Sequence, residues 1–287
     1  HGETLGALAV TDVPIFRTHY GALIKNYIKT DSPDLRLKKN NQSSDEFLDE
    51  KLKKLTKIFE KNHQVTASII IEPMVQCASG MGIYDARFLE GVRKLCDQYE
   101  VHLIADEIAV GFGRTGKMFA HQHAKITPDF VCLSKGLTGG YLPMSVTLTS
   151  DKIYNAFYDD DIKKGFLHSH SYTGNPLACS AALGTLSIFE SDKVLKKNLT
   201  LSKKINRLFS SLEDLPISDL RNIGMIWAFE LDSKISIDKV LAYSLNNGVL
   251  IRPIDNTIYF MPPYCIKESE AREMIKITRE AILYAST

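Results

Sequence analysis

The sequence has no excess of charge of either sign, because 35 lysine and arginine residues stand against 34 aspartate and glutamate residues among its 287 residues. This balance gives no electrostatic reason to expect binding to nucleic acid or to an anionic membrane surface. No apolar stretch approaches the length of a membrane span, and neither internal repeats nor low-complexity segments are present. We therefore predict neither a nucleic-acid partner nor a membrane partner.

Cysteine is also scarce, and it does not form the patterns that disulfide frameworks use. The five cysteines are scattered, odd in number and without a C-x-x-C pair: Cys77, Cys96, Cys132, Cys179 and Cys265. This distribution predicts reduced thiols, as in a cytoplasmic protein. A starting methionine is absent too, and from His1 and Gly2 we expect that an N-terminal part of the polypeptide is missing.

What the chain does contain is an alternation of helical and strand-like segments. Ser43 and Glu46 have the spacing of a capping box, and Asp85 precedes a second helix with one apolar face. Strands are predicted at 67–72, 101–106, 129–133 and 143–149. Strands that alternate with helices indicate an α/β domain with a mostly parallel sheet.

The last third of the chain has a different organisation. A helical pattern over 176–212 is broken near Ser191, where we expect the junction between two domains. Strands are then predicted near 223–231, 249–254 and 258–262, before a last helix that begins at about Glu268. We therefore predict a large domain over 1–190 and a small C-terminal α+β domain over 191–287.

Two of the predicted strands are followed by charged side chains. Asp106 ends the strand at 101–106, and Lys135 comes just after the strand at 129–133. Ligands bind outside the carboxyl ends of the strands in an open α/β sheet, so both side chains should point into one crevice. This pair suits pyridoxal phosphate (PLP), because a lysine can hold that cofactor covalently and a carboxylate can keep its pyridine nitrogen protonated.

Each of these two residues also has a purely structural explanation. A lone aspartate at the end of a strand often caps the next turn, and most lysines lie at the surface. Lys135, however, lies between an apolar run and Gly136, where the backbone can approach a ligand closely. A buried amine near cationic groups becomes nucleophilic. We therefore predict that Lys135 is buried and is the catalytic residue.

A competing motif lies at 111–118, where the glycines and Lys117 fit the phosphate-binding pattern G-x-x-x-x-G-K. The preceding run, which ends in Asp106 and Glu107, resembles the acidic strand of nucleotide hydrolases. Position 118 is nevertheless methionine, so the hydroxyl that would hold magnesium is absent. A nucleotide hydrolase is thus the weaker alternative, and we expect these glycines to shape a turn beside the cofactor.

Two pairs of histidines have the spacing at which both rings of a pair would share one face of a strand: His121 with His123, and His168 with His170. No cysteine or carboxylate lies at metal-ligand spacing from either pair, so we predict no metal site. We expect His121 and His123 on an exposed helix instead.

Arg252 is unusual because it lies inside an apolar run that is predicted to be a strand. A guanidinium in such a place is either paired structurally or kept for a carboxylate ligand, which its fork of donors fits well. The residues alone leave both explanations open.

Four motifs, taken together, resemble the class III (ω-type) aminotransferases of PLP fold type I. They lie at 71–76, 103–116, 133–136 and 172–179, and the similarity extends from His1 to Tyr264. Within the class, the similarity is greatest to enzymes of biotin biosynthesis. The resemblance implies a large α/β domain, incomplete on its N-terminal side, followed by a small C-terminal domain.

The resemblance also implies roles around the cofactor. Lys135 would hold PLP and shuttle a proton, Asp106 would bind the pyridinium nitrogen, and Ile108 would pack beneath the ring. Gln76 would lie near the phenolic oxygen. Ser171 falls at the family's phosphate-binding threonine, which is contributed across a dimer interface.

Further roles concern the substrate. Ser169 and His170, which replace a Gly-Pro pair of close relatives, are assigned to the substrate and to the cofactor respectively. Arg252 would bind the carboxylate of the amino acceptor, with Tyr259 in the same pocket.

The implied reaction is the transamination of 8-amino-7-oxononanoate to 7,8-diaminononanoate, with S-adenosylmethionine as amino donor, in a cytoplasmic homodimer. Another class III enzyme that acts on ω-amino acids or diamines would share every PLP residue and stays an alternative, as does an inactive fragment. The family's glycine-serine phosphate loop lies upstream of His1. We therefore expect the isolated chain to be inactive, or to fold only with its missing portion.

Overall fold

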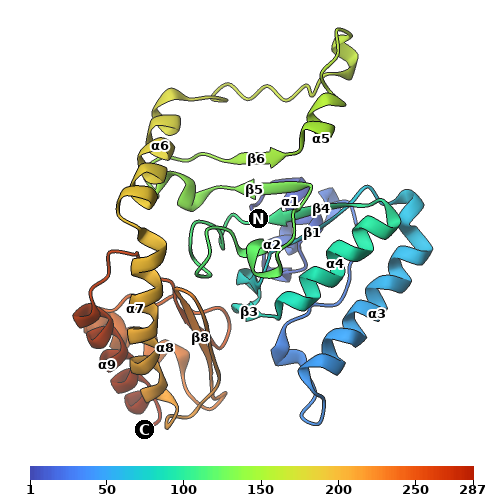
Figure 1. Ribbon diagram of the computed structural model, residues 1–287. Helices are drawn as coiled ribbons and strands as arrows, with labels where there is room; N and C mark the ends of the chain where they lie inside the picture. Colours follow the sequence, from blue (N-terminus) through green and yellow to red (C-terminus); the bar gives the residue numbers. More distant parts are fainter.

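The computed structural model describes residues 1–287, and its largest sheet forms the frame of the molecule (Figure 1). The strand order is β1 (Ser68–Ile71), β4 (His102–Asp106), β5 (Phe130–Leu133) and β6 (Val146–Thr149). The first three strands run parallel, and β6 is antiparallel to β5 at the edge. The predicted α/β domain with a mostly parallel sheet is thereby confirmed.

Two helices, α3 (Ser44–Asn62) and α4 (Ala86–Tyr99), cover one face of this sheet (Figure 1). The Ser43 side chain accepts a hydrogen bond from the Glu46 backbone N–H, and the Glu46 carboxylate accepts one from the Ser43 N–H. Asp85 caps α4 in a similar way. Both predicted helix starts are therefore confirmed, and side chains of both helices pack with Leu103 of β4 in one core of 12 buried residues.

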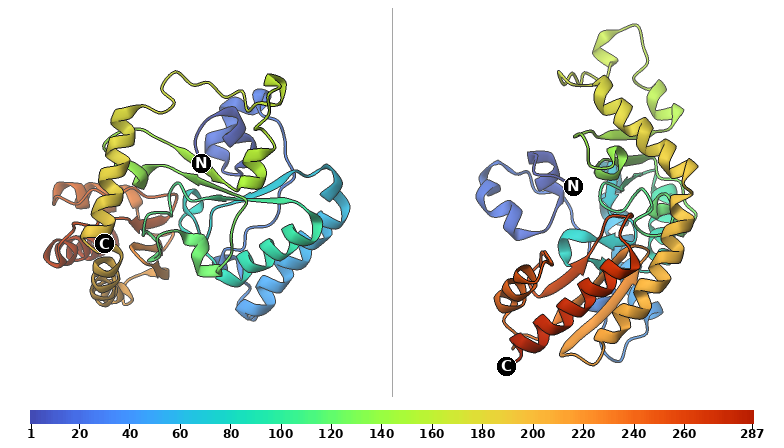
Figure 2. Two further views of the ribbon diagram at one scale, coloured as in Figure 1. Left: turned by 45° about the horizontal axis from the view of Figure 1, so that its top comes forward. Right: turned by 90° about the vertical axis from the view of Figure 1, so that its left-hand side faces the viewer.

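The N-terminal segment stands apart from the body of the molecule (Figure 2). It contains α1 (Leu5–Val10), α2 (Pro14–Arg17) and the 3₁₀ turn η1 (Thr18–Leu23). The 3₁₀ turn η2 (Leu35–Leu37), further along the chain, already contacts the body of the molecule. The core of the N-terminal segment is only three buried residues, Leu8, Ala9 and Ile24. Most of this segment is therefore held by few apolar contacts.

A short hairpin connects β1 to α4 and contributes to the site described below. It pairs β2 (Val75–Gln76) with β3 (Gly82–Ile83), and the 3₁₀ turn η4 (Cys77–Ser79) lies between them. Met74, Val75 and Met81 of this region pack against Ile226 and Ala228 of the C-terminal sheet. The two halves of the molecule thus share a small apolar core.

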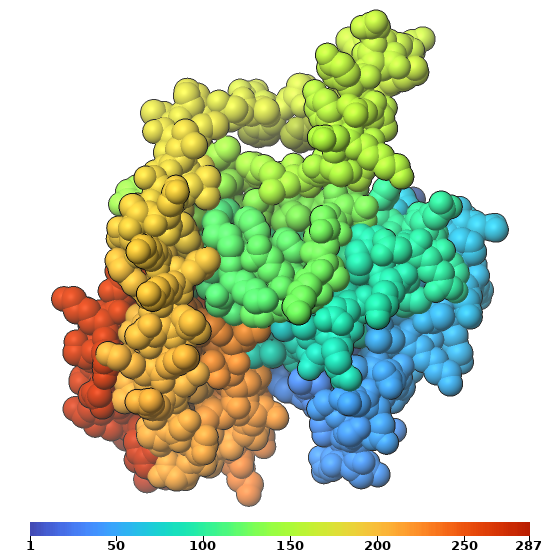
Figure 3. Space-filling view, viewed as in Figure 1, coloured from blue at the N-terminus to red at the C-terminus, as the bar shows by residue number.

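Between β6 and α6 (Pro176–Ser191) the chain forms a long projecting arm. The arm includes α5 (Asp151–Asn155) and the 3₁₀ turn η7 (Ile162–Lys164), and it stands clear of the rest of the surface (Figure 3). Tyr158, Phe166 and Leu167 of the arm are each at least 73% exposed. Large apolar side chains with this much exposure are typical of interaction surfaces.

The C-terminal part is built on the antiparallel sheet β7 (Ile217–Ile223), β8 (Ile226–Leu231) and β9 (Thr257–Phe260). Three helices pack on this sheet: α7 (Val194–Phe209), α8 (Ile237–Asn246) and α9 (Glu268–Ala285). The sheet and these helices enclose a core of 17 buried residues. The helical break near Ser191 and the last helix from Glu268 are as predicted. The exact boundary between 190 and 191 stays a prediction.

Of the strands predicted in this part, the one near 223–231 is found as β8 with a later start, and the one at 249–254 was wrong. The run 223–231 contains the end of β7 and all of β8, because the chain reverses at Gly224, whose φ is +55°. The run 249–254 forms no strand, and only Ile254 makes an isolated bridge, to Thr257. Pro253 has no backbone N–H to donate, which disfavours a ladder at this point.

None of the helices of the structure is long and apolar enough to cross a membrane.

Candidate active site

A broad open cleft of about 2240 Å³ lies between the N-terminal segment, the sheet and the C-terminal part. Six of the residues predicted for the site line it: Gln76, Asp106, Ile108, Lys135, Arg252 and Tyr259. They come from four separate stretches of sequence. The fold therefore brings together six of the nine predicted site residues, some predicted for the cofactor and some for the substrate.

Asp106 ends β4 at the carboxyl edge of the sheet and is only 4% exposed. Its Oδ1 accepts a hydrogen bond of 3.1 Å from the Ile108 N–H, and the residue lines the cleft. A buried carboxylate in this place can accept a hydrogen bond from a cationic N–H group of a ligand in the cleft. A protonated pyridine nitrogen is a donor of the same kind, so this position fits the ring of PLP.

Lys135 follows β5 and begins the 3₁₀ turn η6 (Lys135–Thr138). Its φ of +44° places a non-glycine residue in the left-handed region, which costs about 1–3 kcal/mol and is typical of functional sites. The next residue, Gly136, packs so closely on Phe112 that an added Cβ would lie 2.9 Å from the Phe112 side chain. This contact holds the backbone at Lys135 in place.

The prediction of a buried Lys135 was wrong, because its side chain is exposed in the cleft. The apolar run before it is buried in part, but the chain leaves the sheet at Ser134 and turns Lys135 outward into the open space. A group that binds covalently to a lysine needs such access. The amine is therefore available to a ligand that enters the cleft.

Glu72 was missed as a site residue, although it follows β1 in the same way that Asp106 ends β4. Ile71 pairs with Ala105, so the next residues along these two parallel strands, Glu72 and Asp106, come side by side. Burial, and then the charge of Asp106, raise the pKa of Glu72 to about 7. The signal was a carboxylate at the end of an apolar run, and it was available in the sequence.

This raised pKa makes a prediction about stability. Below pH 4.5 Glu72 is protonated in both the folded and the unfolded chain. Between pH 4.5 and about 7 only the unfolded chain loses this proton. The free energy of unfolding therefore falls as the pH rises through this range. The loss is complete above about pH 7 and amounts to at most about 3 kcal/mol. Glu72→Gln should therefore unfold at higher urea concentration than the unmodified chain at pH 8 and at nearly the same concentration at pH 4.5.

A suitable control for this measurement is Glu60→Gln, because Glu60 is exposed on α3. The control should show no difference in unfolding between the two pH values. An equal effect of Glu72→Gln at both pH values would contradict the assignment of a raised pKa.

Gln76 lies at the end of β2 and is held by Ser32, whose hydroxyl donates to the Gln76 Oε1. Ile108 lies two residues beyond Asp106, on the wall of the same cleft. Both residues are partly exposed. Gln76 can therefore supply an amide N–H to a ligand, while Ile108 can supply an apolar contact near Asp106.

Arg252 lies in an irregular segment, and its side chain is exposed toward the cleft. The prediction of an arginine inside a strand was therefore wrong. No carboxylate of the chain lies within ion-pair distance of this guanidinium, whereas Arg36, Arg93, Arg221 and Arg279 are all paired. An unpaired guanidinium at a cleft favours binding to an anionic ligand over structural pairing.

The three residues predicted for the phosphate end, Ser169, His170 and Ser171, do not line the cleft of this chain. They lie on the projecting arm and are exposed. For Ser171 the predicted route to the cofactor is from a second copy of the chain, and the roles of all three residues stay predictions.

The glycine-rich stretch 111–118 contradicts the nucleotide-hydrolase alternative. It forms a series of turns, and only the short 3₁₀ turn at 120–124 follows it, whereas a phosphate-binding loop needs the N-terminus of an α-helix. Glu107 is fully buried and accepts hydrogen bonds from the N–H groups of Ala120 and His121, each of 2.8 Å. Glu107 is thus a structural residue. The stretch does lie beside the cleft, as predicted.

His121 and His123 lie on a 3₁₀ turn, η5 (Ala120–Ala124), and both are partly buried. The prediction of an exposed helix was wrong because Glu107 and Thr115 bind these two rings at 2.9 and 3.0 Å. No group of three or more potential metal ligands occurs in the structure.

The sequence matches the family described as aminotransferase class-III over residues 1–282. This chain belongs to the class-III aminotransferases. It is 44% identical to the adenosylmethionine-8-amino-7-oxononanoate aminotransferase of Helicobacter pylori and 36% identical to that of Staphylococcus aureus, over 96% and 98% of the chain. These matches span 63% and 65% of the two relatives.

The fold also agrees with this class-III assignment. The crystal structure of the adenosylmethionine-8-amino-7-oxononanoate aminotransferase of Methanocaldococcus jannaschii superimposes with a TM-score of 0.90 at 34% identity. The match covers 100% of this chain and 66% of that structure. The large domain with its mostly parallel sheet is therefore the fold of a class-III aminotransferase.

Proposed function

We propose that this chain carries the catalytic residues for the PLP-dependent transamination of 8-amino-7-oxononanoate to 7,8-diaminononanoate, a step of biotin biosynthesis. The observation that carries the proposal is the meeting of Lys135, Asp106 and Arg252 in one cleft. The relatives named above, which match nearly the whole chain, are aminotransferases of this compound. S-adenosylmethionine is the proposed amino donor.

Each residue of the cofactor end has a separate proposed role. When bound, PLP supplies an electron-accepting ring that weakens the bond from the substrate Cα to its hydrogen. Lys135 would hold the cofactor, and its Nζ, once displaced by the amino donor, would take the proton from the substrate Cα and deliver it to the cofactor C4′. The Asp106 carboxylate would keep the ring nitrogen protonated, Gln76 would donate to the phenolic oxygen, and Ile108 would give an apolar contact to the ring.

The substrate end of the cleft is formed by Arg252 and Tyr259. The guanidinium binds the terminal carboxylate of 8-amino-7-oxononanoate, and the tyrosine ring lies along its aliphatic chain. The absence of a protein partner for Arg252 supports this role, because a free fork of N–H donors at a cleft fits a carboxylate.

A homodimer completes the proposal. Ser171, together with His170, would contact the phosphate of the cofactor in the neighbouring copy, and Ser169 would contact its substrate. The exposed aromatic residues of the projecting arm support an interface there. A cytoplasmic location is part of the same proposal, and the five free cysteines agree with it.

The acceptor assignment is tested with Arg252→Ala. We expect KM for 8-amino-7-oxononanoate to rise about a hundredfold, since a charge-assisted pair with the carboxylate is lost. KM for a keto acceptor of similar length without a carboxylate should hardly change. Steady-state kinetics with both acceptors on the full-length protein provide the measurement.

The matched control is Arg272→Ala, which removes a surface arginine of α9 that pairs with Glu268. It should leave KM for both acceptors unchanged. If Arg252→Ala affects both acceptors equally, the carboxylate role is refuted, and an enzyme for other ω-amino compounds becomes the better assignment.

A further inference from the structure

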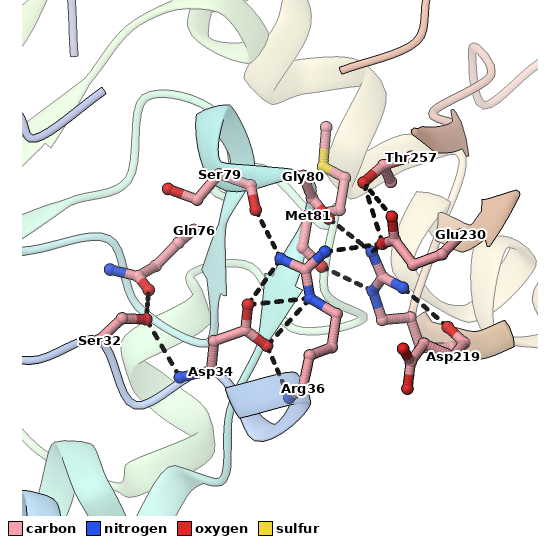
Figure 4. A network of polar contacts seen from close by, with 11 residues as sticks. Ser32, Asp34, Arg36, Gln76, Ser79, Gly80, Met81, Asp219, Glu230 and Thr257 are labelled. Carbon is pink, nitrogen blue, oxygen red and sulfur yellow. Dashed lines mark hydrogen bonds and ion pairs between the residues drawn. The ribbon is translucent and has the colours of Figure 1, made fainter. Parts of the chain in front are cut away.

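Four charged residues form a cluster where the β2–β3 hairpin meets the C-terminal sheet (Figure 4). The charge cluster consists of Asp34, Arg36, Arg221 and Glu230. One carboxylate oxygen of Glu230 accepts hydrogen bonds from both guanidiniums, at 2.7 Å from Arg36 and 2.8 Å from Arg221. Asp34 binds the other side of Arg36 at 2.6 and 2.9 Å. Two positive charges are thus balanced by two negative charges.

The two arginines hold the backbone of the turn between β2 and β3. Arg36 donates to the Ser79 carbonyl at 2.5 Å, while Arg221 donates to the carbonyls of Gly80 and Met81 at 2.6 and 3.0 Å. Three successive carbonyl groups are therefore fixed by side chains from outside the hairpin. Ser79 and Met81 line the cleft, so this turn is a part of the cleft wall.

The approach of the turn to the cluster leaves no room for a side chain at Gly80. An added Cβ would lie 2.6 Å from the Thr257 Oγ1 and 3.0 Å from the Arg36 guanidinium, and the φ of Gly80 is +74°. Thr257 itself donates to both oxygens of Glu230, each at 2.9 Å. The turn and the start of β9 are consequently locked against each other.

The cluster is connected to both ends of the cleft. On one side, the Asp34 N–H donates to the Ser32 hydroxyl at 3.2 Å, and Ser32 holds Gln76. On the other side, Thr257 begins β9, and Tyr259 lies two residues further along the same strand. A contiguous set of contacts therefore runs from a residue at the cofactor end to the strand that carries a residue at the substrate end.

We propose that the charge cluster is a positioning device, in which Glu230 sets the separation between the cofactor end of the cleft at Gln76 and the acceptor end at Tyr259 and Arg252. This inference rests on the proposed function for the identity of the acceptor. Glu230 does not line the cleft. It acts through the turn that it locks, by neutralising two arginines that would otherwise repel each other.

The electrostatics of the cluster agree with a carboxylate that stays ionised. Burial alone would raise the pKa of Glu230, but hydrogen bonds from Arg221, Thr257 and Arg36 outweigh burial and hold the pKa below its usual value. The pKa of Arg221 is lowered by burial and by the charge of Arg36. Removal of the Glu230 charge would therefore leave two close guanidiniums with only one carboxylate.

The test uses Glu230→Gln in the full-length protein, because glutamine keeps the size of the side chain and removes its charge. We expect amide hydrogen exchange of residues 77–81 in the substrate-free protein to become about tenfold faster, as expected for the loss of charge-assisted hydrogen bonds. We also expect KM for 8-amino-7-oxononanoate to rise about tenfold, with kcat nearly unchanged. A residue that served only stability would not separate KM from kcat in this way.

Two further variants keep the test decisive. Arg36→Lys retains the charge but loses the fork, and should show the same changes to a smaller extent even if Glu230→Gln does not fold. Asp214→Asn breaks an exposed pair with Arg279 in the same part of the chain and should change neither quantity. The inference would be overturned if the amide exchange rate at 77–81 stayed unchanged, or if kcat fell by as large a factor as KM rose. If the unmodified protein does not use this acceptor, the proposed function fails, while the exchange measurement still tests the cluster.

Discussion

Replacing Lys135 by alanine is expected to abolish covalent retention of PLP and to lower the rate of transamination at least about a thousandfold, because one amine both holds the cofactor and transfers the proton. The structure supports this expectation, since Lys135 is an exposed amine in the cleft that also contains Asp106. Borohydride reduction followed by peptide mass mapping should find the cofactor on Lys135 in the unmodified protein. The Lys135→Ala protein should yield no such peptide.

Lys117→Ala is the natural control for this experiment. Lys117 belongs to the glycine-rich stretch and donates to the Gln122 carbonyl at 2.9 Å, so it has a local structural partner. The control should keep both the labelled peptide and the rate. Retained labelling at another lysine in Lys135→Ala would show that the cofactor lysine has been assigned wrongly.

Asp106→Asn should lower kcat about a hundredfold while the cofactor is still bound, since the anionic partner of the ring nitrogen is lost but the local turn is kept. An asparagine oxygen can still accept the hydrogen bond from the Ile108 N–H, so the end of β4 should keep its conformation. Single-turnover kinetics separate the proton-transfer step from binding. The thermal unfolding midpoint should be measured in parallel to confirm that the fold is intact.

A matched variant for comparison is Asp97→Asn, which removes an exposed partner of Arg93 on α4. No change in the kinetics is expected there. If Asp106→Asn retains full single-turnover rates, the carboxylate is not the partner of the ring nitrogen, and its capping of the next turn is the better explanation.

The sheet and its two charged ends could be predicted because the signals are local. A short apolar run predicts a buried strand, and the rule that ligands bind at the carboxyl ends of parallel strands then brings Asp106 and Lys135 together without further information. The register of β4 and β5, in which Asp106 pairs with Cys132, shows why the rule succeeds here. Glu72 obeys the same rule at β1 and could have been found with it.

Other features could not be predicted because they depend on contacts between distant residues. The partly buried state of His121 follows from Glu107, whose carboxylate turns inward and not toward the cleft. Arg252 lies in an apolar run that nevertheless forms no strand, because Pro253 interrupts it. The cluster around Glu230 joins residues 194 positions apart, such as Arg36, and no spacing pattern reports on a contact of that kind.

The contact between Phe112 and Gly136 has a wider consequence for how this chain can vary. Phe112 also packs edge-on against Phe119 and near Phe189. This group of aromatic rings therefore supports the left-handed backbone conformation of Lys135. Two of these rings, Phe112 and Phe189, also line the cleft. Reshaping them would therefore change the position of the reactive amine and the shape of the cleft wall at the same time.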